Sequence, residues 1–168
     1  MKRILVLSTM ILSLFGLRAA AAPLELGAAA PAVVALTDAG TELDLAAHCA
    51  TGFTLVYFYP KADTGGCTAQ GCSLRDAYAD LTAQGVKVVG VSTDAVAAQK
   101  AFREKNRFPF PLLADTDKKV TAAFGVPTTL GFASRQAFLF KDGKLVWRDL
   151  KASTAQQAAD VLAALKTL

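Results

Sequence analysis

The sequence predicts a single α/β domain of three layers, with a central mixed sheet, helices on both faces and a small N-terminal hairpin. Two observations favour this class: a segment with helical periodicity separates two continuous apolar runs, and a strong hairpin signal follows later in the chain. The chain has 168 residues, of which 53% are hydrophobic and 19% are charged. It is therefore long and apolar enough to fold around a core of its own.

The N-terminal hairpin is expected over Ala32–Leu36 and Glu42–Leu45. These short apolar stretches are separated by Asp38–Gly40, which contains residues that favour a turn.

The centre of the sheet is predicted from Phe53–Tyr59 and Val86–Ser92. Both runs are rich in aromatic or β-branched residues, which is typical of strands buried on both faces, and Pro60 ends the first. Between them, Cys67–Gln84 has apolar residues spaced by four and then three positions and stops before Gly85, which predicts a helix. A strand, a helix and a strand of these lengths form a crossover unit with parallel strands.

Three more helices and three short strands complete the expected domain. The helices are Asp94–Asn106 capped by Thr93 or Asp94, Asp117–Phe124 capped by Asp115 or Thr116, and a C-terminal helix capped by Ser153. The apolar face of the first is expected to contain Val96, Ala97, Ala101 and Phe102. The strands are Leu112–Leu113 and the pair Gln136–Phe140 and Lys144–Leu150, which flank the turn-forming Asp142–Gly143.

Residues 1–21 are predicted to be a secretory signal peptide, and residues 22–168 the mature domain. Lys2–Arg3 supplies a positive start, Ile4–Leu17 an apolar run of fourteen residues, and Ala19–Ala22 the small residues at which cleavage occurs, preferably after Ala21. The run is shorter than the roughly 20 apolar residues that cross a bilayer. An uncleaved N-terminal anchor is the alternative, because Arg18 follows the apolar run.

Cleavage would release a soluble, exported protein, in the periplasm or outside the cell, with no stable membrane association. No cysteine follows the small residues, so a lipid anchor is not expected there. The chain has 18 Lys and Arg against 14 Asp and Glu. Three of the cations, Lys2, Arg3 and Arg18, lie within the signal, and without them 15 cations face 14 anions. A balance near zero gives no reason to expect a nucleic-acid partner.

The three cysteines are an odd number, which is a poor fit to a purely structural set of disulfides in an exported protein. Cys67 follows two glycines and opens the predicted helix, where free N–H groups and the positive helix end stabilise a thiolate. Thr64 can place a hydroxyl beside that sulfur, and Pro60 can close one side of the loop. Cys72 is near enough to act as a partner thiol after a rearrangement. The segment predicts a redox-active cysteine.

The cysteines have other possible interpretations. Cys67 could be a small buried hydrophobe, or it could form a structural disulfide with Cys72. A metal site is a poor fit because His48 is the only histidine and zinc sites typically need four ligands. His48 is expected at the surface or at a helix end, and Cys49 is expected to be structural or incidental. Neither a metal nor a haem is expected.

The segment Tyr57–Asp76 resembles the peroxiredoxins, whose active-site loop is written P-x-x-x-T-x-x-C and appears here as Pro60, Thr64 and Cys67. The second cysteine of CTAQGC resembles the subgroup known as bacterioferritin comigratory protein or PrxQ. The resemblance covers everything after residue 31, including the hairpin led by Arg135, and implies a thioredoxin-like fold.

The resemblance also implies roles. Cys67 would be the peroxidatic cysteine, Cys72 the resolving one, and Thr64 and Arg135 the activating partners. The protein would reduce hydrogen peroxide and organic hydroperoxides through a sulfenic acid and an intramolecular disulfide, without a cofactor, and a thioredoxin-like dithiol would reduce it. We expect a monomer. The sequence departs from the subgroup at two positions, with Gly65 where proline is common and Gln70 where glutamate is frequent.

Rival classes make different demands. A thioredoxin-type thiol-disulfide oxidoreductase usually carries C-x-x-C, whereas four residues separate Cys67 from Cys72 here. A copper-delivery protein of this fold would need a distant histidine in addition to a cysteine pair, and no histidine follows residue 48. A non-catalytic module with a structural disulfide would consume no peroxide.

Overall fold

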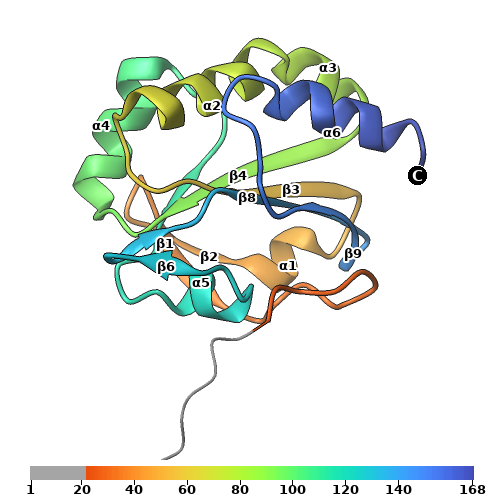
Figure 1. The fold of residues 1–168 in the computed structure, drawn as a ribbon, viewed down its shortest axis with the longest axis horizontal. Helices are drawn as coiled ribbons and strands as arrows, with labels where there is room; N and C mark the ends of the chain where they lie inside the picture. Colours follow the sequence, from red (N-terminus) through yellow and green to blue (C-terminus); the bar gives the residue numbers. More distant parts are fainter. Residues whose placement is uncertain (1–21) are drawn as a thin grey trace, which may run out of the picture.

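The structure is a computed structural model that describes residues 22–168, so the predicted signal peptide lies outside the described residues. Seven of its strands form one mixed sheet: β1 Val34–Thr37, β2 Glu42–Asp44, β3 Phe53–Phe58, β4 Val86–Ser92, β5 Leu112–Ala114, β8 Gln136–Lys141 and β9 Lys144–Asp149. They lie in the order β2-β1-β5-β4-β3-β8-β9 (Figure 1). Two very short strands, β6 Thr128–Thr129 and β7 Phe132–Ala133, pair separately and were not predicted.

The central strands follow the sequence expectation. β3 pairs with β4 in parallel and with β8 antiparallel, so the predicted crossover unit and the mixed sheet are confirmed. β1 and β2 form the predicted hairpin, and β1 also pairs with β5, which makes the hairpin one edge of the main sheet. At the β8–β9 turn, Asp142 and Gly143 both have positive φ, as the predicted hairpin turn requires.

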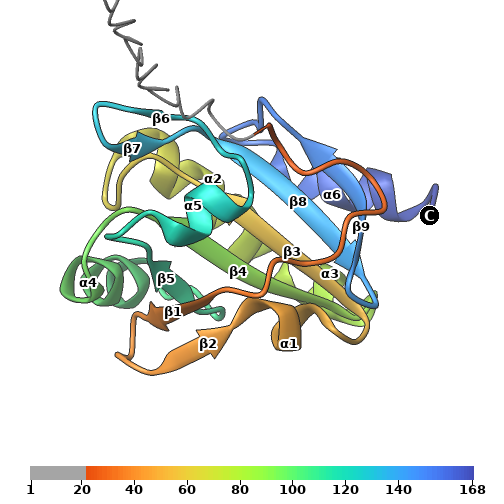
Figure 2. The same ribbon diagram turned by 90° about the horizontal axis from the view of Figure 1, so that it is seen from below.

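Six helices cover the sheet within the described residues: α1 Leu45–Cys49, α2 Gly65–Asp76, α3 Tyr78–Ala83, α4 Val96–Asn106, α5 Lys119–Ala123 and α6 Gln157–Leu165. In Figure 1, α2, α3, α4 and α6 lie on one face of the sheet, and Figure 2 shows α1 and α5 on the other. Each face has its own cluster of buried apolar side chains, one under α2, α3, α4 and α6 and the other under α1 and α5. The three-layer prediction is confirmed.

The helix predicted over Cys67–Gln84 is wrong in one respect, because it is two helices. α2 begins two residues earlier than expected, and the helix breaks at Ala77, whose φ of −95° and ψ of 11° are not helical. The break leaves Leu74 and Leu81 fully buried on the same face of the sheet. The sequence spacing therefore identified the buried residues but not the bend between them.

The helix caps predicted for α4, α5 and α6 differ from those in the structure. The N-cap of α5 is Lys118 and not the predicted Asp115 or Thr116, although the Asp115 carboxylate accepts hydrogen bonds from the N–H groups of Val120 and Thr121 in the first turn. Asp94 does not cap α4, whose N-cap is Ala95. The apolar face predicted for α4 is right only in part: Phe102 is buried and Val96 half-buried, but Ala97 and Ala101 are exposed, and the polar Gln99 is buried.

Ser153 does not cap the C-terminal helix. Its Oγ accepts a hydrogen bond from the Gln156 N–H at 3.1 Å, and α6 begins only at Gln157. In α6, Val161 is fully buried, and Leu162 and Leu165 pack against the same core cluster.

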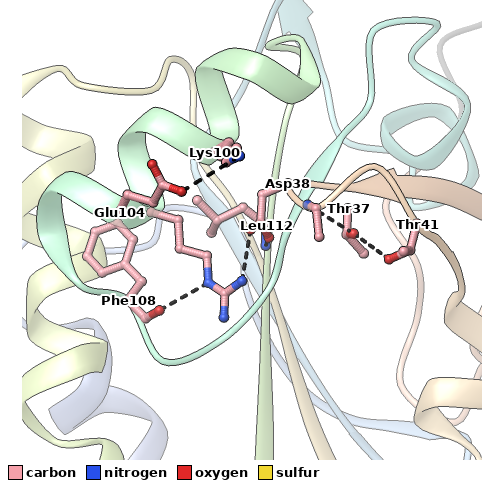
Figure 3. Close-up of polar contacts among 9 residues, drawn as sticks. Thr37, Asp38, Thr41, Lys100, Glu104, Phe108 and Leu112 are labelled. Atoms are coloured by element: carbon pink, nitrogen blue, oxygen red, sulfur yellow. Dashed lines mark hydrogen bonds and ion pairs between the residues drawn. The ribbon is translucent and has the colours of Figure 1, made fainter.

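The N-terminal hairpin is fastened to the rest of the domain by Asp38, which is buried. One carboxylate oxygen of Asp38 accepts a hydrogen bond from the Leu112 N–H at 2.9 Å, and the other pairs with Arg103 Nη1 at 2.8 Å. Arg103 also donates to the Phe108 carbonyl oxygen at 3.1 Å (Figure 3). A buried carboxylate needs such partners, so these contacts fix α4 against the edge of the sheet.

No helix among residues 22–168 is long and apolar enough to cross a membrane. Within the same residues, no group of three or more His, Cys, Asp or Glu side chains is placed to hold a metal ion.

Candidate active site

Cys67 lies in the first turn of α2, as the sequence predicted. Thr64 is the N-cap of this helix, and Gly65 and Gly66 are its first two residues. The Cys67 side chain is 2% exposed and packs into the core cluster under α2. Cys72 lies on the same helix, half-buried, and both thiols are free. As the third residue of α2, Cys67 lies in the turn whose N–H groups have no partner within the helix.

Arg135 reaches Cys67 from the loop between β7 and β8. Its Nη2 donates to Cys67 Sγ at 3.5 Å, and its Nη1 donates to Gln70 Oε1. Two donors of one planar guanidinium thus bind two side chains of α2, one turn apart. The structure brings Arg135 and Cys67 together, although 68 residues separate them in the sequence.

Gly66 gives the guanidinium room to approach. A Cβ atom at this position would lie 3.3 Å from Arg135 Nη2 and 3.3 Å from Thr154 Cγ2. Such distances are tight for carbon, so an alanine here would press on the group that contacts Cys67. A Cβ at Gly65 would meet no atom within 4 Å.

Thr64 and Pro60 belong to the loop that leads into α2. The Thr64 hydroxyl donates to the Lys61 carbonyl oxygen at 3.0 Å, and its carbonyl oxygen accepts from the Thr68 N–H at 2.8 Å. Thr64 is exposed, and no hydrogen bond from its hydroxyl to Cys67 is present among the described residues. Pro60 is half-buried, two residues after the end of β3. Their predicted roles toward the sulfur remain predictions.

A buried polar network holds this loop, and sequence reasoning did not find it. Asp94 Oδ2 accepts from the Ala62 N–H and from the Ser92 hydroxyl, both at 2.7 Å. Gln99 Nε2 donates to the same hydroxyl at 2.8 Å, and the Tyr59 hydroxyl donates to Gln99 Oε1. The available signal was that parallel strands β3 and β4 end at the same edge, which brings Ser92 and Asp94 beside the loop.

Tyr57 lies under α2 with its hydroxyl fully buried and without a partner among the described residues. Burial raises its pKa well above the ordinary value, and the neighbouring Tyr59 and Cys67 raise it further. The phenol therefore stays protonated beside the two cysteines.

Cys49 and His48 are removed from this site. They end α1, on the other face of the sheet, where Cys49 is buried in the second core cluster. Burial raises the pKa of the Cys49 thiol to about 11. Burial, and then the charge of Lys87, lower the pKa of His48. This placement confirms that His48 lies at a helix end, and it fits the expectation that Cys49 is structural or incidental.

A hollow of about 410 Å³ between α4 and the turn after β1 is separate from the cysteines. Its lining includes Asp38, Arg103 and Phe108 and no residue of α2. Cys67 is instead packed in the core cluster under α2.

A family match and two similar relatives agree with one another. Residues 26–148 match the AhpC/TSA family. A peroxiredoxin bcp of Coxiella burnetii is 41% identical over 103 residues, which cover 61% of this chain and 68% of that protein. The chloroplastic peroxiredoxin Q of Triticum aestivum is 46% identical over 76 residues, which cover 45% of this chain and 35% of the relative. The matched segment thus spans only about a third of the wheat protein.

Solved structures extend the similarity to nearly the whole of each neighbour. Peroxidoxin BcpB from Mycobacterium tuberculosis superposes with a TM-score of 0.79 at 32% identity, covering 85% of this chain and 97% of that one. The bacterioferritin comigratory protein of Xanthomonas campestris superposes with a TM-score of 0.77 at 34% identity, covering 88% and 98%. The thioredoxin-like fold implied by the resemblance is confirmed.

Proposed function

Because this chain belongs to the AhpC/TSA family, we propose that it is a thiol-dependent peroxidase of the peroxiredoxin Q type, with Cys67 as the peroxidatic cysteine. The observation that carries the proposal is the 3.5 Å contact of Arg135 Nη2 with Cys67 Sγ, in the first turn of a helix that bears a second thiol. The alkyl peroxide reduction named for the Xanthomonas campestris protein supports organic hydroperoxides as substrates beside hydrogen peroxide.

In the first step, the Cys67 thiolate attacks one oxygen of the peroxide and the O–O bond breaks. The other oxygen takes a proton and leaves as water or an alcohol, so the sulfur is oxidised to sulfenic acid while the peroxide is reduced by two electrons. Arg135 carries donors only and would stabilise negative charge first on sulfur and then on the departing oxygen. Thr64 would add its hydroxyl once it turns away from the Lys61 carbonyl oxygen.

In the second step, the Cys72 thiol attacks the sulfenic sulfur, water leaves, and a disulfide forms between Cys67 and Cys72. A thioredoxin-like dithiol then reduces this disulfide by exchange and leaves with a disulfide of its own. No metal or prosthetic group takes part in either step as written.

Counting thiols tests this sequence. The reduced protein has three free cysteines, and one equivalent of hydrogen peroxide should leave one thiol. Cys72→Ser should lose one of its two thiols and become labelled by dimedone, whereas Cys67→Ser should keep both. The matched control Cys49→Ser should lose both of its remaining thiols. Wild-type protein that keeps all three thiols and consumes no peroxide would contradict the proposal.

We further propose that the protein is exported and acts as a monomer with Ala22 as its first residue. The basic, apolar and small-residue pattern of residues 1–21 supports export. The position of both cysteines on one helix supports a monomer, because the disulfide then needs no second chain. N-terminal sequencing of the protein from a periplasmic fraction and light scattering of the purified protein test both. A chain that starts at Met1 in the cytosol, or a stable dimer, would contradict them.

A further inference from the structure

Gln157, the first residue of α6, is fully buried although glutamine is mostly a surface residue. Its Oε1 accepts a hydrogen bond from Gln70 Nε2 at 2.8 Å. Its own Nε2 is one of three buried side-chain polar atoms without a partner among residues 22–168. A buried donor without a partner destabilises the folded state. The amide therefore calls for a reason other than stability.

The reason lies in the hydrogen bond made by the other polar atom of the Gln70 amide, its oxygen. Gln70 Oε1 accepts from Arg135 Nη1, while Arg135 Nη2 donates to Cys67 Sγ. A guanidinium has only donors, so the oxygen of the Gln70 amide must face it and the nitrogen must point away. That nitrogen needs an acceptor, and Gln157 Oε1 is the acceptor present. The orientation of each group in the series Cys67, Arg135, Gln70 and Gln157 is thus set by its hydrogen-bond partner.

The start of α6 is also fixed against α2 by a second hydrogen bond. Ser73 Oγ on α2 accepts from the Ala158 N–H at 3.0 Å. Thr154, just before α6, brings its methyl group to the same side of Gly66 as Arg135 Nη2. Figure 1 shows the two helices side by side. Gln157 is therefore held in place independently of the amide pair that it completes.

We propose that Gln157 is a positioning residue for the peroxide step: its Oε1 fixes the Gln70 amide, whose oxygen aims Arg135 at Cys67. The proposal rests on the peroxidase function proposed above. Without the Gln157 acceptor, the Gln70 amide is free to rotate and to present its NH₂ group to the guanidinium. Two donors would then face each other, and Arg135 would leave the sulfur.

Single-turnover kinetics of the reduced protein with hydrogen peroxide test this role. Gln157→Leu removes the acceptor. Gln157→Met, measured in parallel, removes it too but keeps an unbranched side chain. Both should slow oxidation of Cys67 about 10-fold or more, because small misplacements of a charge-stabilising group reduce rates strongly. Gln157→Glu keeps an acceptor and should stay within about threefold of wild type. Gln156→Leu, the same substitution one residue earlier at an exposed position, is the matched control.

A double-mutant cycle separates positioning from a merely structural role. In the Arg135→Ala background, Gln157→Leu should leave the residual peroxide rate unchanged, because the residue through which it acts is gone. Equal slowing in both backgrounds, or Gln157→Leu and Gln157→Met proteins that react like wild type, would overturn the proposal. Failure of the proposed function has a different signature, since the wild-type protein would then consume no peroxide.

Discussion

Cys49 and Cys67 lie on opposite faces of the seven-stranded sheet. Cys67 packs in the core cluster beneath α2, and Cys49 packs in the cluster beneath α1 and α5. Adjacent residues of β3 belong to different clusters, Val56 to that of Cys49 and Tyr57 to that of Cys67, so the sheet lies between the two thiols. Neither thiol can reach the other without disruption of the sheet, which leaves Cys72 as the one cysteine of this chain that shares a helix with Cys67.

The separation of the two faces predicts how the cysteine variants behave. Cys67→Ser should abolish peroxidase turnover, because no other thiol lies beside Arg135. Cys49→Ser should leave steady-state turnover within about threefold of wild type, a difference of less than about 1 kcal/mol in activation free energy. Steady-state assays of both variants check this. A folded but inactive Cys49→Ser protein would contradict the assignment.

Cys49 also predicts a pH dependence of stability. Its pKa of about 11 in the folded protein exceeds the value of 9.0 for a free thiol, so the folded state holds this proton more tightly. The contribution to stability, on the order of 2–3 kcal/mol, is complete below pH 9 and is lost as the pH rises through 11. The free energy of unfolding of wild type relative to Cys49→Ala, from urea titrations, should therefore fall between pH 8 and pH 11. A constant difference would contradict the raised pKa.

Local patterns in the sequence predicted the frame of this fold. The continuous apolar runs became β3 and β4, and Asp142–Gly143 became the β8–β9 turn, because strand burial and positive φ depend on residues close together in the chain. The short helix α1 was not predicted, since five residues are too few to show helical periodicity.

The contacts that complete the site join distant parts of the chain. Gln70 and Gln157 are 87 residues apart, and no local pattern indicates that they meet. Asp94 was interpreted as a helix cap, but its carboxylate binds the Ala62 N–H across 32 residues. Arg135 was placed by the family resemblance, and composition or periodicity alone would not have identified it.

Arg135→Ala should slow the reaction of Cys67 with hydrogen peroxide by roughly 10²–10³, as the loss of one preorganised donor does in other active sites. The fold should survive, because Arg135 is only half-buried. The rate of Arg135→Lys should fall between the rates of wild type and Arg135→Ala, since an ammonium group cannot bind Gln70 and Cys67 as a planar fork. Stopped-flow rates decide this, and a rate for Arg135→Ala within a factor of three of wild type would exclude a role for the guanidinium.

Gly65→Pro should stabilise the protein by about 0.4–1 kcal/mol, because a proline restricts the unfolded chain. Gly65 is the first residue of α2, a position that proline favours, and its Cβ site is empty. Thr64 before it has φ −100° and ψ 153°, the conformation that a following proline requires. Urea denaturation measures the gain.

The matched control for that change is Gly71→Ala, in the same helix. A Cβ at Gly71 would lie 2.4 Å from Phe108 Cζ, so this variant should be destabilised although alanine favours a helix. Close packing against Phe108 thus explains this glycine. Equal stability of the two variants would contradict the packing argument.

The distance between Cys67 and Cys72 predicts a change of conformation during turnover. On a regular helix, residues five apart have Cα atoms about 8.7 Å apart, whereas disulfides need roughly 4.4–6.8 Å. Both cysteines lie within the continuous helix α2. The disulfide therefore cannot form until the turns around residues 68–73 unwind.

Unwinding of α2 would break the hydrogen bonds from Gln70 to Gln157 and from the Ala158 N–H to Ser73, so the first turn of α6 should loosen as well. We expect amide hydrogen exchange at residues 68–73 and at Ala158 to be much faster in the disulfide form than in the reduced form, because local opening exposes these amides to water. The amides of β3 and β4, at the centre of the sheet, serve as the internal control and should be protected in both forms. Equal protection of residues 68–73 in the two forms would rule out unwinding, and peptide mapping of the oxidised protein would then have to find another partner for Cys67, such as a thiol from outside the chain.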